Sequence, residues 1–183
     1  LDFAREGGVG HFLCVCIDME NYTNVLEIAE HYQDVSASVG LHPTERVQNE
    51  PSVEELVGKG ANKKVVAVGE TGLDYYHKDT VPDLQRERFR RHIQAAKTLK
   101  KPLIVHSRMA KEDTIHILKE ENAAEVGGVL HCFTEDWEMA EKAIDLNFYI
   151  SFSGIVTFQN ALDLREVAKK VPLEHMLIET DSP

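Results

Sequence analysis

The chain has 183 residues, of which 43% are hydrophobic and 28% charged, the proportions of a soluble globular protein. This length allows one domain with a substantial core, and because no apolar run approaches ~18 residues we expect no membrane span. The net charge of −11 argues against nonspecific coating of nucleic acid, but allows a local basic patch or a metal site that neutralises phosphate.

The cysteines and the N-terminal residues bear on the compartment. Three Cys are too few for a disulfide scaffold, and Cys14 and Cys16 lie in an apolar run, as buried reduced thiols do. Residues 1–6 show no signal-peptide pattern. We therefore predict a cytoplasmic protein, with no membrane association and no obligate protein partner.

Strand-like and helix-like segments alternate along the chain. Helices are predicted at residues 1–8, 24–33, 52–58, 83–100, 112–121, 136–146 and 161–171. Strands are predicted at residues 12–17, 35–41, 65–70, 103–106, 126–132, 148–152 and 176–179. Ser52 followed by Glu55 makes a capping-box pattern at the start of the third helix.

This alternation of strands and helices predicts an α/β fold with a parallel sheet covered by helices. An open doubly wound sheet and a closed (β/α)₈ barrel both satisfy it. The chain begins on a helix and ends on a strand, with seven predicted strands. We therefore favour a TIM-type (β/α)₈ barrel that lacks its first strand and final helix here. Residues 1–183 are expected to form a single domain, incomplete at both ends.

Four of the predicted strands carry, at or just after their ends, a residue that can bind a metal. These are Glu70, His106, His131 and Asp181. Parallel strands point the same way, so the four side chains should gather at the carboxyl edge, where α/β folds place ligands. Two imidazoles and two carboxylates suit Zn²⁺ or Mn²⁺ better than Ca²⁺. A single His at a strand end is more often a hydrogen-bonded structural residue, and only the combination indicates a metal site.

Two further polar residues follow strands and leave two interpretations each. His42 faces the pocket or is a turn residue before Pro43. Arg108 contacts a substrate phosphate, whose geometry its guanidinium matches, or forms a salt bridge with Glu112 or Asp113.

Two residues after Glu70 also have both a functional and a structural interpretation. Asp74 orients a metal ligand from behind or caps the turn, and Tyr75 contacts substrate or packs on a helix. Glu179 is a weaker candidate than Asp181 for an acid/base role. The basic run of residues 86–92 is expected to be a solvated helix face.

Several segments resemble the TatD family. They are residues 40–43 (GLHP), 69–75 (GETGLDY), 105–108 (VHSR), 130–133 (LHCF) and 178–183 (IETDSP). The resemblance implies a metal-dependent hydrolase on a TIM-type barrel related to the amidohydrolases, with several deoxyribonucleases among its members. It also implies that Glu70 bridges two divalent ions, that His106 and His131 bind one, and that Asp181 binds the other. The Asp-x-His-x-His segment of the family's opening strand is not in this sequence.

The resemblance therefore implies a deoxyribonuclease or phosphodiesterase with DNA as its partner and two divalent ions (Zn, Mn or Mg) as cofactors. Glu70 and Asp181 are the expected catalytic residues, and Asp181 is the candidate base for the attacking water. A hydrolase of amide or ester bonds and a degenerate binding protein are the alternatives. We expect residues 1–183 alone to fold poorly, to bind at most one ion tightly and to be a weak nuclease.

Overall fold

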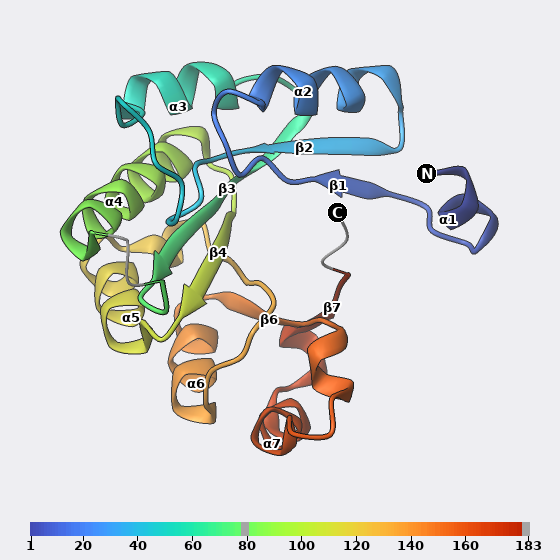
Figure 1. Cartoon of the computed structure of the whole chain (residues 1–183), viewed down its shortest axis with the longest axis vertical. Helices are drawn as coiled ribbons and strands as arrows, with labels where there is room; N and C mark the ends of the chain where they lie inside the picture. Colours follow the sequence, from blue (N-terminus) through green and yellow to red (C-terminus); the bar gives the residue numbers. More distant parts are fainter. Residues whose placement is uncertain (78–80, 181–183) are drawn as a thin grey trace.

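The computed structural model describes residues 1–77 and 81–180. Their seven strands form one sheet in chain order, and every neighbouring pair is parallel. The strands are β1 (Phe12–Cys14), β2 (Val35–Val39), β3 (Val65–Asp74), β4 (Leu103–Arg108), β5 (Gly128–Leu130), β6 (Phe148–Phe152) and β7 (Met176–Ile178). The sheet is strongly curled, with β1 and β7 at its two edges in the described part of the chain (Figure 1). The predicted TIM-type α/β architecture is confirmed.

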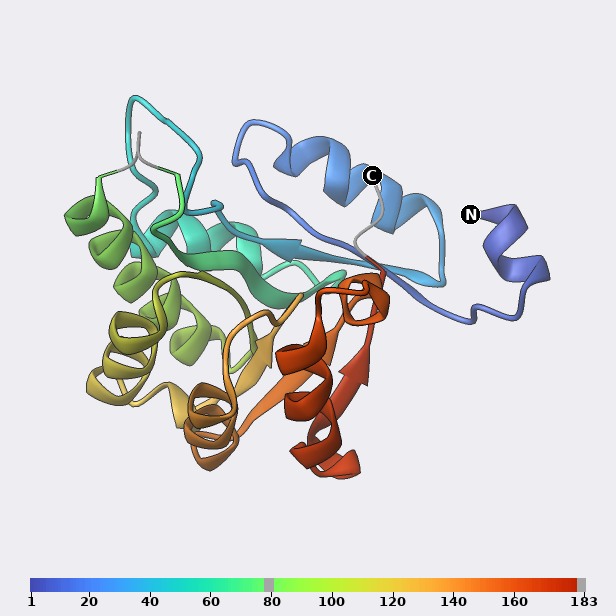
Figure 2. The same cartoon turned by 60° about the horizontal axis from the view of Figure 1, so that its bottom comes forward.

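Helices pack along the convex side of the curled sheet (Figures 1 and 2). They are α1 (Asp2–Glu6), α2 (Tyr22–His31), α3 (Val53–Gly60), α4 (Pro82–Leu99), α5 (Lys111–Glu120), α6 (Trp137–Asp145) and α7 (Leu162–Lys170), with short 3₁₀ turns η1 (Ala123–Glu125), η2 (Gly154–Thr157) and η3 (Leu173–His175). Helix α1 projects from the body of the domain (Figure 1). Its Arg5 forms an ion pair at 2.7 Å with Asp34, the residue before β2. Within residues 1–77 and 81–180 no helix is both long and apolar enough to cross a membrane.

The predicted elements all occur, with ends that differ by a few residues. The Ser52 hydroxyl accepts a hydrogen bond from the Glu55 backbone N–H at 3.1 Å, as the capping pattern predicts. The largest difference is at β3, which continues past the predicted end at Glu70 to Asp74 because its last residues pair with β4. Two candidate site residues therefore lie on the same strand.

The basic run on α4 corrects the sequence analysis. Arg88 is only 2% exposed and His92 is fully buried, beside Phe89 and Ile93. The Arg88 guanidinium forms an ion pair with Glu50, which offsets the cost of burying its charge. Because Arg88 and His92 lie one helical turn apart, both face the sheet, and the prediction of a solvated face is wrong at these two positions.

The contact between β3 and β4 depends on a glycine. Gly72 has φ +132°, and it pairs in register with His106. A Cβ atom at Gly72 would lie 2.0 Å from the His106 carbonyl oxygen. Only glycine therefore allows the backbone of His106 to lie this close to β3.

We expect Gly72→Ala to lower the free energy of unfolding by at least about 3 kcal/mol, because it adds both a backbone strain and a steric overlap. Gly58→Ala is the matched control, because Gly58 lies in α3 with open space around it. There alanine should raise the free energy of unfolding by up to about 1 kcal/mol. Urea unfolding of both variants checks this, and equal stabilities would contradict it.

Candidate metal centre

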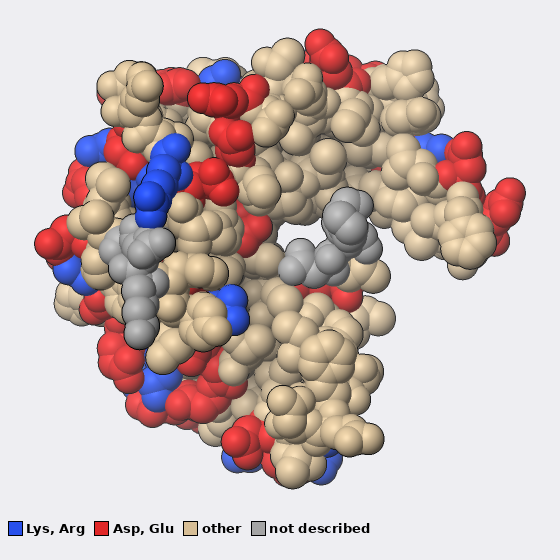
Figure 3. Space-filling view, viewed as in Figure 1, with Lys and Arg blue, Asp and Glu red and all other residues tan. Residues whose placement is uncertain are grey.

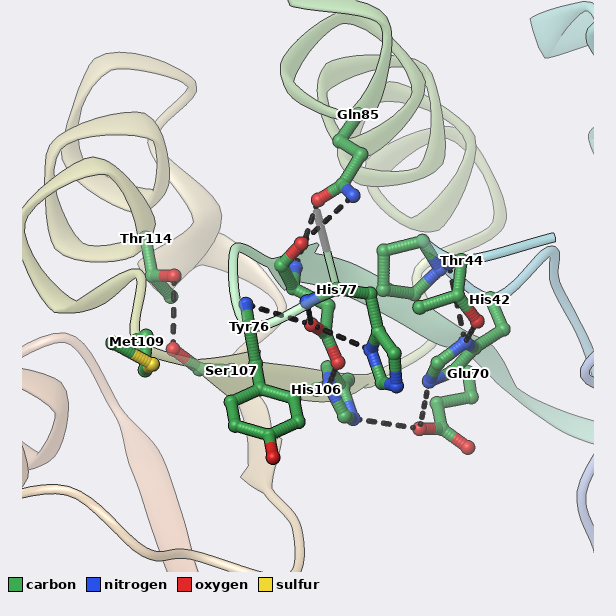
Figure 4. A network of polar contacts seen from close by, with 12 residues as sticks. His42, Thr44, Glu70, Tyr76, His77, Gln85, His106, Ser107, Met109 and Thr114 are labelled. Atoms are coloured by element: carbon green, nitrogen blue, oxygen red, sulfur yellow. Dashed lines mark hydrogen bonds and ion pairs between the residues drawn. The ribbon is translucent and has the colours of Figure 1, made fainter. Parts of the chain in front are cut away.

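The carboxylate of Glu70 is the centre of the site. Its side chain leaves β3 at the carboxyl end of the sheet, and the residue is 8% exposed. Its backbone N–H donates to the Cys16 carbonyl at 2.9 Å, which ties β3 to the loop after β1. One oxygen, Oε1, lies 2.8 Å from His131 Nε2, 3.2 Å from His106 Nδ1 and 3.2 Å from His42 Nε2. Figure 4 shows the rings of His42 and His106 directed at this carboxylate.

The charges of these groups depend on one another. Burial acts to raise the pKa of Glu70, but hydrogen bonds from His106, His131 and His42 outweigh it and hold that pKa well below its usual range. Burial acts to lower the pKa of His131, but contacts with Glu179 and Glu70 outweigh it and raise the pKa to about 10. Without a metal, the centre is therefore an ionised carboxylate beside a protonated imidazole.

His106 is oriented by a second carboxylate. Its Nε2 lies 3.0 Å from Oδ2 of Asp74, which leaves Nδ1 directed at Glu70. The other Asp74 oxygen accepts the backbone N–H groups of Tyr76 at 3.0 Å and His77 at 3.2 Å. Asp74 is thus placed to fulfil both alternatives from the sequence, since it caps the turn and faces the far side of the imidazole of His106, a candidate metal ligand.

His131 has a corresponding partner that the sequence analysis ranked low. Oε1 of Glu179 lies 3.7 Å from His131 Nδ1, and the same carboxylate accepts the backbone N–H of Cys132. A carboxylate behind the imidazole is the usual arrangement at protein metal sites, where it fixes the ring and its proton. The signal for Glu179 was its place two residues before Asp181 at the end of a strand.

The donor set fits a divalent transition metal. Ligand atoms of His42, Glu70 and His106 all lie within 4.8 Å of one another, and His131 shares the same Glu70 oxygen. These residues line a cavity of about 540 Å³, which Arg108 also lines. Imidazole nitrogens with a carboxylate oxygen suit Zn²⁺ or Mn²⁺.

Comparison with known proteins identifies the family of this chain. The family described as TatD related DNase matches residues 1–183. The chain belongs to the TatD-related DNase family. It is 50% identical to the uncharacterized metal-dependent hydrolase YcfH of Escherichia coli K12 over 172 residues, which are 93% of this chain and 64% of that protein. The chain therefore spans less than two thirds of that relative.

Other relatives agree. The uncharacterized metal-dependent hydrolase YabD of Bacillus subtilis is 41% identical over all of this chain and 72% of its own length. The crystal structure of YjjV, a TatD homologue from E. coli K12, superposes with a TM-score of 0.93 at 34% identity, covering 100% of this chain and 71% of that one. A TatD family hydrolase from Entamoeba histolytica gives a TM-score of 0.87 at 27% identity, covering 100% and 64%.

Two further residues predicted for the site of this TatD family member are Asp181 and Arg108. Asp181, the predicted ligand and base, lies outside the described residues. Arg108 lies at the pocket, with its guanidinium 3.9 Å from the centre of the Tyr76 ring. Among residues 1–77 and 81–180 it forms no ion pair with Glu112 or Asp113, so that alternative is wrong.

Tyr75 does not line the pocket. Its hydroxyl donates to Asp113 at 2.6 Å and accepts from Arg86 at 3.1 Å, so the ring packs between β3 and helices α4 and α5. Tyr75 thus packs on the helices, and the predicted substrate contact is wrong. Successive residues of an extended chain face opposite ways, so Tyr75 and Tyr76 point in different directions. Its neighbour Tyr76 is 53% exposed.

Sequence reasoning also missed Gln85 of α4. Its side-chain oxygen accepts the Asp74 backbone N–H at 2.8 Å, and its amide nitrogen donates to the Asp74 carbonyl at 2.9 Å. Gln85 therefore holds the main chain of Asp74, whose carboxylate contacts His106. The available signal was helical spacing, because Gln85 lies four residues before the core residue Phe89.

We expect metal binding to release a proton near neutral pH, because a metal requires neutral imidazole while His131 has a pKa of about 10 in the metal-free protein. The raised pKa stabilises the metal-free fold below pH 6.5, and this stabilisation is lost as the pH rises through about 10. The apparent affinity for Zn²⁺ should therefore rise across that window. Calorimetric titration at pH 7.5 in two buffers of different ionisation enthalpy measures the release, and identical enthalpies in both would contradict it.

Proposed function

We propose that this member of the TatD family is a divalent-metal-dependent deoxyribonuclease that uses two ions. The observation that carries the proposal is the convergence of three imidazoles on one buried carboxylate oxygen, that of Glu70, at the carboxyl edge of a parallel sheet. The family description, TatD related DNase, supports DNA as the substrate.

Three described residues are the proposed metal ligands. Glu70 would offer its carboxylate, His106 its Nδ1 and His131 its Nε2, with Asp74 and Glu179 behind the two imidazoles. Asp181 is the predicted ligand for a second ion. Bound there, divalent ions would supply charge to polarise the phosphodiester and would lower the pKa of an attacking water toward neutral pH.

The protein's own groups would bind and orient the phosphate. The chain carries a net charge of −11, and acidic side chains are spread over the face seen in Figure 3. A phosphodiester therefore needs local positive charge. Arg108 lines the pocket beside His106, and its planar guanidinium can form two parallel hydrogen bonds to a phosphate. We assign Arg108 to the substrate phosphate.

Hydrolysis of an amide or ester bond by the same cage is the alternative, because a fold and a metal site do not fix the substrate. The deciding assay gives the full-length protein single-stranded DNA and a panel of small esters and amides, with Zn²⁺, Mn²⁺ or Mg²⁺. We expect DNA to be cleaved and a chelator to abolish cleavage. Turnover confined to the esters or amides would overturn the proposal.

Glu70→Ala should abolish metal binding and DNA cleavage together, because it removes the oxygen that all three imidazoles face. The rate should fall by at least about 10³-fold. Far-UV circular dichroism should remain unchanged. Glu141→Ala on the exposed side of α6 is the matched control and should keep both properties. A Glu70→Ala protein with near-normal metal content and turnover would contradict the assignment.

A further inference from the structure

His42 differs from the other two imidazoles in what lies behind it. His106 and His131 each have a carboxylate on the side away from Glu70. The corresponding nitrogen of His42, Nδ1, instead faces Thr44. The Thr44 hydroxyl oxygen lies 2.7 Å from it, and the Thr44 backbone N–H donates to it at 3.3 Å.

These contacts favour one position for the His42 ring proton. The Thr44 backbone N–H can only donate, and the Thr44 hydroxyl can donate to the same nitrogen, so Nδ1 is placed as an acceptor and the ring proton on Nε2. That N–H points at Oε1 of Glu70, 3.2 Å away. Metal coordination through Nε2 would move the proton to Nδ1, where it could donate to the Thr44 hydroxyl but would displace the hydrogen bond from the Thr44 backbone N–H. His42 is therefore arranged as a donor, unlike the two carboxylate-backed imidazoles.

The turn that carries His42 is held from two sides. The His42 backbone N–H donates to the Ile17 carbonyl at 2.9 Å, and the Leu41 N–H donates to His92 Nε2 at 3.1 Å. His92 accepts this bond because its own Nδ1 donates to the Arg88 carbonyl at 2.8 Å.

Arg88 adds the closest contacts to this turn. Its Nη1 donates to the His42 carbonyl at 2.6 Å, its Nη2 donates to the Glu45 carbonyl at 3.0 Å, and its Nε donates to Glu50 at 2.8 Å. The residue is 2% exposed, so these groups have little access to water. One buried guanidinium thus fixes the backbone on both sides of Thr44, the residue that sets the His42 proton.

We propose that His42 donates a hydrogen bond from Nε2 to an oxygen of the substrate phosphate and is not a metal ligand, and that Arg88 is the residue that positions it. This inference rests on the proposed function. His42 lines the same cavity as His106, His131 and Arg108, so its N–H would face a phosphate held there when metal ions occupy Glu70. A fixed donor aimed at developing negative charge is typically worth about 10²–10³ in kcat.

Two variants of similar shape separate a donor from a ligand. His42→Gln keeps an N–H donor and offers a poor ligand, whereas His42→Glu offers a good ligand and no donor. We expect His42→Gln to bind Mn²⁺ within about threefold of wild type, while His106→Gln loses about 10-fold or more. The Mn²⁺-loaded His42→Glu protein should bind inorganic phosphate at least about 10-fold more weakly than His42→Gln, and should cleave DNA about 10²-fold more slowly than wild type.

The opposite pattern would overturn the proposal. If His42→Gln loses Mn²⁺ affinity as His106→Gln does and His42→Glu restores it, His42 is a ligand. If neither variant changes phosphate affinity or kcat, His42 is only a turn residue. If the wild-type protein does not cleave DNA, the proposed function fails, and the Mn²⁺ and phosphate titrations still decide the role of His42.

Arg88→Lys tests the positioning role, because an ammonium group cannot match the planar set of bonds to Glu50 and two carbonyls. We expect kcat to fall about tenfold, with KM and Mn²⁺ affinity unchanged, since the metal ligands stay in place. Arg90→Lys is the matched control, because Arg90 lies on the same helix and pairs with Glu120 at the surface, and it should leave kcat unchanged.

An unchanged kcat in Arg88→Lys, or a parallel loss of Mn²⁺ affinity, would overturn the positioning role. Should Arg88→Lys not fold, Glu50→Gln is the second variant, because it weakens the Arg88 ion pair and leaves the guanidinium in place. The same fall in kcat without a change in Mn²⁺ affinity is then expected, and an unchanged kcat would overturn the role.

Discussion

The buried charge of Glu70 is the constraint on which the rest of the site depends. An ionised carboxylate with so little exposure requires positive or hydrogen-bonding partners, because burying an unpaired charge is strongly unfavourable. His42, His106 and His131 supply those partners from the ends of three other elements. A parallel sheet makes this possible, since every strand delivers its last residue to the same edge. A metal ion would replace the protons that now link Glu70 to His106 and His131.

Helix α4 provides the polar support behind this edge. Gln85 binds the main chain of Asp74, and His92 and Arg88 bind the turn around His42. The three side chains are buried. His92 is neutral, because burial lowers its pKa to about 4 and leaves Nε2 free to accept the Leu41 N–H. The longest helix of the described chain therefore both covers the sheet and fixes two of the loops that form the site.

The sequence predicted the elements that depend on local patterns. Apolar β-branched runs such as residues 65–69 and helical spacing identified the alternating fold, and the residues ending those runs identified Glu70, His106 and His131 as neighbours. Parallel strands turn a one-dimensional pattern into a shared location, so the approximate place of the site followed directly.

What the sequence did not predict depends on long-range pairing. The charge of Arg88 predicts a solvated residue, and its burial depends on partners distant in sequence: the ion pair with Glu50, 38 residues away, and the carbonyls of His42 and Glu45. Which of Tyr75 and Tyr76 packs on the helices depends on where β3 ends, and the sequence did not predict that this end lies at Asp74. The pattern around Glu179 does not show its importance, because its partner His131 follows a different strand, β5, 48 residues earlier in the chain.

The most direct test of the centre is a crystal structure of the full-length protein loaded with Zn²⁺, with the ion located by anomalous scattering. We expect a Zn²⁺ ion bound by Glu70, His106 Nδ1 and His131 Nε2, with metal–nitrogen distances of about 2.0–2.1 Å. His42 Nε2 should lie outside its coordination shell. An ordered Zn²⁺ ion away from Glu70, with none between these imidazoles, would contradict the account.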